Sequence, residues 1–243
     1  MLHNIWDSLL YKPFVNLLAV LVSIMPGGDL GLAVIILTIL VKTALFPLSQ
    51  RSIESQAKMK LLEPEIAKIK AGGASKEEQA RLTFELYKTH KTNPFSGCLL
   101  VLIQIPIIFA LYYVFFKGIN FDSNLYSFVK IPTHINANFL GLIDLNGKSL
   151  VLAILAGVSQ FLQAFYMPKG SSSSDGKGSF QDSFNKSMQM QMKYVFPVLI
   201  VFIAYRISGA VALYWIVSNI FTVFQQIYIN KKNSNIIKNK VLS

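Results

Sequence analysis

Long apolar stretches alternate with polar segments along this chain, and five of the apolar stretches approach the length of a membrane-crossing helix. An α-helix needs roughly 20 apolar residues to cross a hydrocarbon core about 30 Å thick. The pattern predicts an all-α integral membrane protein with five transmembrane helices. The predicted spans cover residues 30–50, 97–116, 149–167, 190–205 and 210–229.

The segment before the first span, residues 1–29, has an apolar run at 14–25 that is too short to cross a bilayer. Its aromatic residues favour an interfacial or re-entrant helix on the extracytoplasmic side. A signal peptide is the weaker alternative, because Lys12 is the one early basic residue and no small-x-small cleavage site follows.

Residues 51–95 contain nine Lys or Arg and six Glu, and two helical patterns are separated by the pair Gly72-Gly73. We expect a cytoplasmic helical hairpin that is kinked near Pro64. A solvated loop with modest amphipathicity is the alternative.

Three further segments connect or follow the predicted spans. Residues 117–148 are predicted to form an extracytoplasmic loop, and residues 168–189 a Ser/Gly-rich cytoplasmic loop with a flexible linker at its start. Residues 230–243 form a basic cytoplasmic tail whose Asn/Lys-rich composition favours disorder.

Composition agrees with this interpretation, because 53% of the 243 residues are hydrophobic and 14% are charged. The net charge is +11, and its distribution predicts the orientation of the chain. With the N-terminus outside, inside segments hold seventeen Lys or Arg and outside segments hold four. The excess of basic residues on the cytoplasmic side predicts an outside N-terminus and a cytoplasmic C-terminus.

One charge, Lys42, interrupts the first span. At a rise of about 1.5 Å per residue it lies about 18 Å below Leu30, past the midplane of the bilayer. None of the five spans contains Asp or Glu. The lysine must therefore be hydrated in a cavity, be solvated by neighbouring dipoles or lose its proton. Snorkelling toward the nearer interface is the structural alternative.

Neutral polar residues accompany Lys42 in the spans. Singly, each is best explained by interhelical hydrogen bonding. Together with an unpaired cation they favour a water-filled cavity that would attract a polar or acidic segment. The candidate lining residues are Thr38, Lys42, Gln104, Gln160, Gln163, Trp215, Ser218 and Asn219.

Metal and disulfide chemistry receive no support from the sequence. Cys98 is the single cysteine, and the three histidines have no metal-ligand spacing. We therefore expect no internal disulfide and no metal ion, and no cofactor is expected.

Several stretches resemble the YidC insertase family, which includes the mitochondrial Oxa and chloroplast Albino proteins. The resemblance covers nearly all of residues 31–229 in the family's order. Its segments are VKTALFPLSQ (41–50), QAKMKLLEPEIAKIK (56–70), ELYKTHKTNPFSGCLLVLIQIPIIFALYYVF (85–115), MQMKYVFPV (190–198) and SGAVALYWIVSNIFTVFQQ (208–226).

The resemblance implies a five-span core in a bacterial cytoplasmic membrane, with a hydrophilic groove open to cytoplasm and lipid. It implies a non-enzymatic insertase and chaperone for nascent membrane proteins, with the ribosome, the Sec translocon and the lipid bilayer as partners. No nucleic-acid function is expected beyond ribosome contact. Lys42 stands where the family has a groove arginine, and Trp215 matches an aromatic groove position. The resemblance also implies a polar groove residue on the third span, which is either Gln160 or Gln163.

Two other functions compete with insertion. A small polar-solute or ion transporter would use polar spans and an intramembrane cation, but the missing carboxylates and the absence of an inverted repeat argue against it. A non-transporting assembly factor would only hold other membrane proteins together.

Overall fold

The computed structural model describes residues 6–93, 96–116, 125–167, 187 and 190–241. The predicted linker at the start of residues 168–189 lies outside the described residues. Helices dominate what is described, which confirms the all-α prediction. In chain order the elements are η1 Asp7–Tyr11, α2 Lys12–Ile24, η2 Pro26–Gly28, α3 Leu30–Ala44, α4 Phe46–Leu61, α5 Glu63–Ala71, α6 Lys76–Thr89, α7 Ser96–Phe116, β1 Asn138–Phe139, β2 Ile143–Asp144, α8 Leu150–Tyr166, η3 Gln191–Val195, α10 Phe196–Arg206 and α11 Gly209–Val241.

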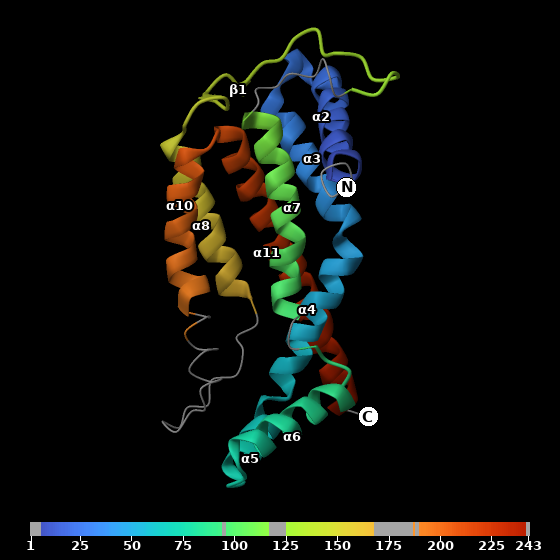
Figure 1. The fold of residues 1–243 in the computed structure, drawn as a ribbon, viewed down its shortest axis with the longest axis vertical. Helices are drawn as coiled ribbons and strands as arrows, with labels where there is room; N and C mark the ends of the chain where they lie inside the picture. The colour runs from blue at the N-terminus through green and yellow to red at the C-terminus, as the bar shows by residue number, and fades with distance from the viewer. Residues whose placement is uncertain (1–5, 94–95, 117–124, 168–186, 188–189, 242–243) are drawn as a thin grey trace.

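The molecule is an elongated bundle whose main helices follow its long axis (Figure 1). Helix α8 packs between α10 and α11, while α11 also contacts α3, α4 and α7. Helix α2 lies against α3. The loop that contains the two-stranded β1–β2 hairpin crosses the upper end, and α5 and α6 form the lower end (Figure 1).

The first predicted span differs from the expected single helix. Helix α3 ends at Ala44, α4 begins at Phe46, and the two are bent by 63°. Pro47 explains this break, because its nitrogen has no hydrogen to donate to a carbonyl in the preceding turn and its ring crowds that turn.

Residues 51–93 form three helical pieces, namely the end of α4 followed by α5 and α6. The first break falls at Leu62, and Pro64 occupies the first turn of α5, where a missing N–H is tolerated. Helix α5 ends before Gly72, and Gly73 adopts a φ of +70° that leads the chain into α6. Helices α5 and α6 then lie against each other.

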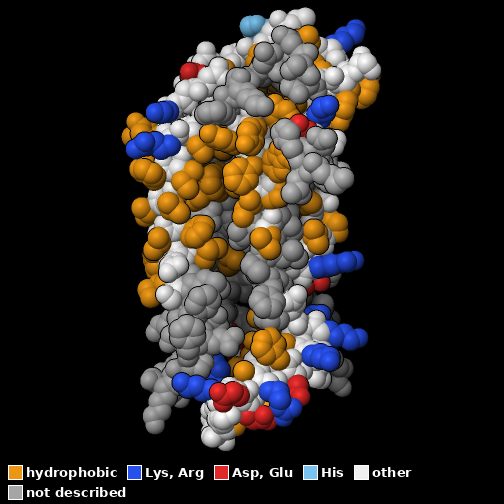
Figure 2. All heavy atoms as spheres, viewed as in Figure 1, with side chains coloured by type: hydrophobic (Ala, Val, Ile, Leu, Met, Phe, Trp, Pro, Cys, Tyr) orange, Lys and Arg blue, Asp and Glu red, His pale blue; other side chains and the backbone are white. Residues whose placement is uncertain are grey.

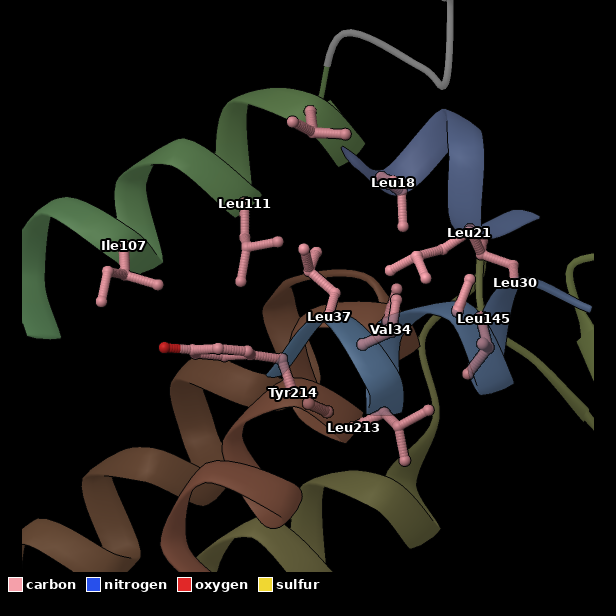
Figure 3. Close-up of a cluster of buried hydrophobic side chains, with 14 of the residues drawn as sticks. Leu18, Leu21, Leu30, Val34, Leu37, Ile107, Leu111, Leu145, Leu213 and Tyr214 are labelled. Atoms are coloured by element: carbon pink, nitrogen blue, oxygen red, sulfur yellow. The ribbon is translucent and has the colours of Figure 1, made fainter. Parts of the chain in front are cut away.

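The apolar core lies in the upper half of the bundle, where α2, α3, α7 and α11 meet. Leu37 and Leu111 are fully buried there, and the aromatic ring of Tyr214 lies among them (Figure 3). Leu145, from the loop that crosses the upper end, is buried in the same cluster. The loop is therefore part of the core and is not a loose connection.

The last helix is longer than expected. Residues 230–241 continue α11 to Val241, so the prediction of a disordered tail was wrong for these residues. Between Gly209 and Val241 the chain has no further Gly and no Pro, and so nothing interrupts the helix. Residues 242 and 243 lie outside the described residues.

By length and hydropathy, the described residues contain one helix able to cross a membrane, Gly209–Lys231. The bent pair α3 and α4 adds a second if it counts as one span. Shorter apolar helices cover Lys12–Ile24, Gln104–Phe115 and Leu150–Tyr166. Hydrophobic side chains cover much of the upper and middle part of the face in Figure 2, and charged side chains gather toward its ends. Five spans thus stay a prediction.

A glycine permits the closest approach between α8 and α10. A Cβ atom at Gly157 would lie 2.3 Å from Cγ2 of Val201 and 3.0 Å from the carbonyl oxygen of Pro197. We predict that Gly157→Leu lowers the unfolding free energy by about 1–3 kcal/mol, because the added side chain must push the two helices apart.

Thermal unfolding of the purified protein in detergent measures this effect. Val158→Leu is the matched control, because Val158 is the next residue on α8 and its side chain is exposed. Equal melting temperatures for Gly157→Leu and the control would contradict the close packing of α8 on α10.

Candidate functional site

Lys42 lies near the lower end of α3, half-buried between α3, α7 and α11. Its Nζ donates to Oε1 of Gln104 on α7 at 3.2 Å and to Oγ1 of Thr222 on α11 at 3.1 Å. Both acceptors are neutral oxygens, and no carboxylate pairs with Lys42 among the described residues. The sequence leaves hydration, solvation by neighbouring dipoles and loss of the proton open for this lysine. The structure shows solvation by neighbouring dipoles.

The two acceptors are themselves held in place. Nε2 of Gln104 donates to the hydroxyl of Tyr214, which fixes the amide with its oxygen toward Lys42. The hydroxyl of Thr222 donates to the carbonyl oxygen of Ser218, 2.9 Å away, so its lone pairs remain available to the ammonium. Tyr214 and Thr222 are both buried, and the acceptors are therefore preorganised.

A second polar contact lies beyond the bend, toward the lower end of the bundle. Ser49 on α4 and Gln225 on α11 are hydrogen-bonded side chain to side chain, with 3.0 Å from Oγ to Oε1 and 2.8 Å between Nε2 and Oγ. Nε2 of Gln225 also donates to the carbonyl oxygen of Phe46 at 3.3 Å. This contact ties the first turn of α4, just after the bend, to α11.

A third polar contact joins α11 to α8. Nδ2 of Asn219 donates to Oγ of Ser159 at 3.0 Å and to Oε1 of Gln160 at 3.2 Å, and all three side chains are buried. Ser159 donates in turn to the carbonyl oxygen of Ala156. The structure thus brings Gln160 to the polar face of α11, whereas the side chain of the half-buried Gln163 makes no hydrogen bond to another described residue.

Exposure divides the predicted site residues into two groups. The half-buried group, reachable from outside the bundle, comprises Lys42, Gln104, Gln163 and Trp215. The buried group comprises Thr38, Gln160, Ser218 and Asn219. Thr38 has no exposed surface and donates to the carbonyl oxygen of Val34, so it supports the site from within and does not face solvent.

Two residues that the candidate set omits, Tyr214 and Thr222, complete the Lys42 site. Thr222 shares the polar stripe of α11 with Asn219 at i and i+3, so the spacing of polar residues in the sequence already indicates it. Tyr214 stands beside Trp215 in an apolar stretch, and its role depends on α7 and α11 meeting, which no local pattern shows. Gln226 is 1% exposed and has no hydrogen-bond partner for its amide among the described residues.

Metal chemistry finds no support in the described residues, which contain no group of three or more His, Cys, Asp or Glu that could hold a metal ion. The cluster consists of one cation and neutral amides and hydroxyls. The amides and hydroxyls can form hydrogen bonds with a polar segment, and the ammonium can attract an acidic one.

Comparison with known proteins yields one family and many relatives. The profile of the family described as "60Kd inner membrane protein" matches residues 21–236. A "Membrane protein insertase YidC" of Fusobacterium nucleatum is 36% identical over 85% of this chain and 89% of the relative. A "Membrane protein insertase YidC 1" of Lactococcus lactis is 30% identical over 91% of the chain and 74% of the relative. A longer relative from Geotalea daltonii is 33% identical, and the match covers 38% of its length.

The contact of Asn219 with Gln160 predicts a measurable coupling between α11 and α8. We expect Asn219→Ala and Gln160→Ala each to lower the unfolding free energy by about 0.6–2 kcal/mol, the range for hydrogen bonds between membrane helices. The double variant should lose less than the sum of the two, because both single changes remove the same hydrogen bond.

Unfolding in detergent measures the unfolding free energies of the two single variants and the double variant. Ile220→Ala, on the exposed side of α11, is the control. Strict additivity of the two changes would mean that the hydrogen bond contributes nothing.

Proposed function

Because this chain belongs to the 60Kd inner membrane protein family, we propose that it is a membrane protein insertase that moves nascent proteins into the bilayer. The observation that carries the proposal is the ammonium of Lys42, held by two neutral oxygens between α3, α7 and α11. The relatives of this chain are named membrane protein insertases, and a polar site without a reactive group is compatible with such a role.

In this proposal the chain crosses a bacterial cytoplasmic membrane five times, with its N-terminus outside and its C-terminus in the cytoplasm. The spans are α3 with the start of α4, then α7, α8, η3 with α10, and α11. Cations lie over aromatic rings at both ends of the segment formed by η3 and α10. Lys193 in η3 is 5.3 Å from the ring centroid of Phe165 on α8, and Arg206 at the end of α10 is 4.9 Å from that of Phe202. Such pairs are typical of the two membrane–water interfaces and support a crossing by α8 and α10.

The segments outside the spans receive distinct roles. Helices α5 and α6 form a cytoplasmic hairpin, and α2 lies at the outer interface beside α3. The basic residues of the hairpin and of the end of α11 are suited to contact with the ribosome, whose RNA is anionic. The Sec translocon is the proposed partner within the membrane.

The proposed mechanism shortens the apolar distance that a client must cross. In the proposed groove, the accessible wall consists of Lys42, Gln104, Gln163 and Trp215. The buried Thr222 and Tyr214 hold Lys42 and Gln104 in position. A client's polar outer segment enters this groove, where an acidic residue is attracted to Lys42. The client's apolar helix then moves sideways into lipid, since apolar burial is favourable by about 25 cal/mol per Å².

Replacement of Lys42 tests the role of its charge. In a strain depleted of its own insertase, Lys42→Arg should restore growth, because the guanidinium keeps a cation at this position. Lys42→Ala should impair insertion, most strongly for clients with acidic outer segments. Protease protection of radiolabelled clients measures insertion.

Lys12→Ala is the matched control for that experiment, because it removes an exposed cation outside the site. Normal insertion of every client by Lys42→Ala would refute the charge role while leaving the family assignment intact.

Photocrosslinking separates an insertase from an assembly factor. A photoreactive amino acid at Trp215 should crosslink to short ribosome-bound nascent chains, because an insertase meets its client before synthesis ends. The same amino acid at Val198, which is 71% exposed on α10, should crosslink far less. Crosslinks from position 215 only to completed membrane proteins would favour the assembly factor.

A further inference from the structure

Residues 125–148, the described part of the predicted extracytoplasmic loop, expose large hydrophobic side chains. Phe128 and Leu142 are 80% and 84% exposed, values higher than those of most apolar residues on the helices. Exposed apolar side chains in a loop that stands in water are unfavourable, and clustered ones mark an interaction surface. These residues form two apolar fingers, Tyr126 with Phe128 and Leu140 with Leu142.

The first finger is rigid and anchored to α2. The rings of Tyr126 and Phe128 stack with centroids 5.4 Å apart and planes 24° apart. The N–H of Tyr126 donates to Oδ1 of the buried Asn16 at 2.6 Å, and the N–H of Val129 closes a turn onto the carbonyl of Tyr126. The exposure of Phe128 is therefore built into a fixed turn.

The second finger is the tip of the β1–β2 hairpin. Leu140 has a φ of +51°, a conformation that is uncommon for a bulky residue, and Gly141 follows with a φ of +72°. Turns of this kind usually contain Asn, Asp or Gly, yet here two leucines flank the glycine. The N–H of Leu140 donates to Oδ2 of the buried Asp29, whose other oxygen caps α3.

The base of the loop is fixed to the bundle. Leu145 is fully buried, its N–H donates to the carbonyl of Ala137, and its own carbonyl accepts from Ala210 at the start of α11. Asn136 exchanges hydrogen bonds with Gly28 and Leu30 beside α3. The two fingers thus belong to a loop whose backbone is hydrogen-bonded to the bundle and which crosses its upper end (Figure 1).

We propose that the two fingers insert into the outer membrane–water interface and anchor the upper end of the bundle to lipid. Leu150 and Val151, at the start of α8 just after the hairpin in sequence, are also exposed, at 56% and 60%. Exposed Lys130 and Lys148 lie near the fingers in sequence and suit lipid phosphates.

Aromatic and basic side chains side by side are the pattern of residues at the lipid headgroup level. In Figure 2 basic and hydrophobic side chains adjoin each other at the upper end of the visible face. The inference rests on the proposed orientation of the chain but not on its insertase activity.

Depth-dependent fluorescence quenching tests this anchor. Phe128→Cys and Leu142→Cys, each in a Cys98→Ser background, are labelled with an environment-sensitive fluorophore. The full chain is reconstituted into phosphatidylcholine–phosphatidylglycerol vesicles without client or partner. Ser127→Cys and Asn146→Cys are the matched controls, because both positions are exposed polar neighbours of the fingers.

We expect labels at 128 and 142 to be quenched several-fold more by lipids with a nitroxide near the top of the acyl chain than labels at 127 and 146. Iodide in the medium should show the reverse order. Equal iodide quenching at all four positions would overturn the proposal. Shielding from iodide without quenching by lipid would also overturn it, in favour of a protein surface such as a second copy. If a variant fails to fold, Ile131→Cys replaces it.

Discussion

The hydrogen bonding of one ammonium group determines how the helices must meet. A lysine between apolar helices is stable only where polar atoms replace its water. Lys42 finds them on α7 and α11, 62 and 180 residues further along the chain. These contacts bring the first, second and last long apolar segments together. The same helices build the buried apolar cluster of Figure 3, with Leu37 on α3, Leu111 on α7 and Tyr214 on α11.

Helix α11 contributes a side chain to each of the three polar contacts of the site, although Lys42 also binds Gln104 on α7. Asn219 binds α8, Thr222 binds Lys42 on α3, and Gln225 binds α4 beyond its bend. These residues follow one another within two turns of a single helix, so one polar stripe orients three neighbours. The stripe therefore links α11 to α8, α3 and α4 through polar side chains.

The sequence predicts most of the helices, but it does not predict which side chains on different helices contact one another. Apolar length located α7 and α8 to within a residue or two of their observed bounds, and Ser149 caps α8 as its residue type favours. The bend after Ala44 was missed, although Pro47 provides a local reason for it. The choice between Gln160 and Gln163 and the role of Tyr214 could not be derived, because both depend on contacts between distant helices.

Chemical labelling of position 42 tests the central proposal, that Lys42 lies in a groove open to the inner side of the membrane. Lys42→Cys in a Cys98→Ser background would be treated with a membrane-impermeant maleimide, added to either side of sealed vesicles. The account predicts rapid modification from the cytoplasmic side and none from the outer side. A cysteine that reacts only after detergent is added would show that position 42 lies in a dry interior or in lipid, and would contradict the account.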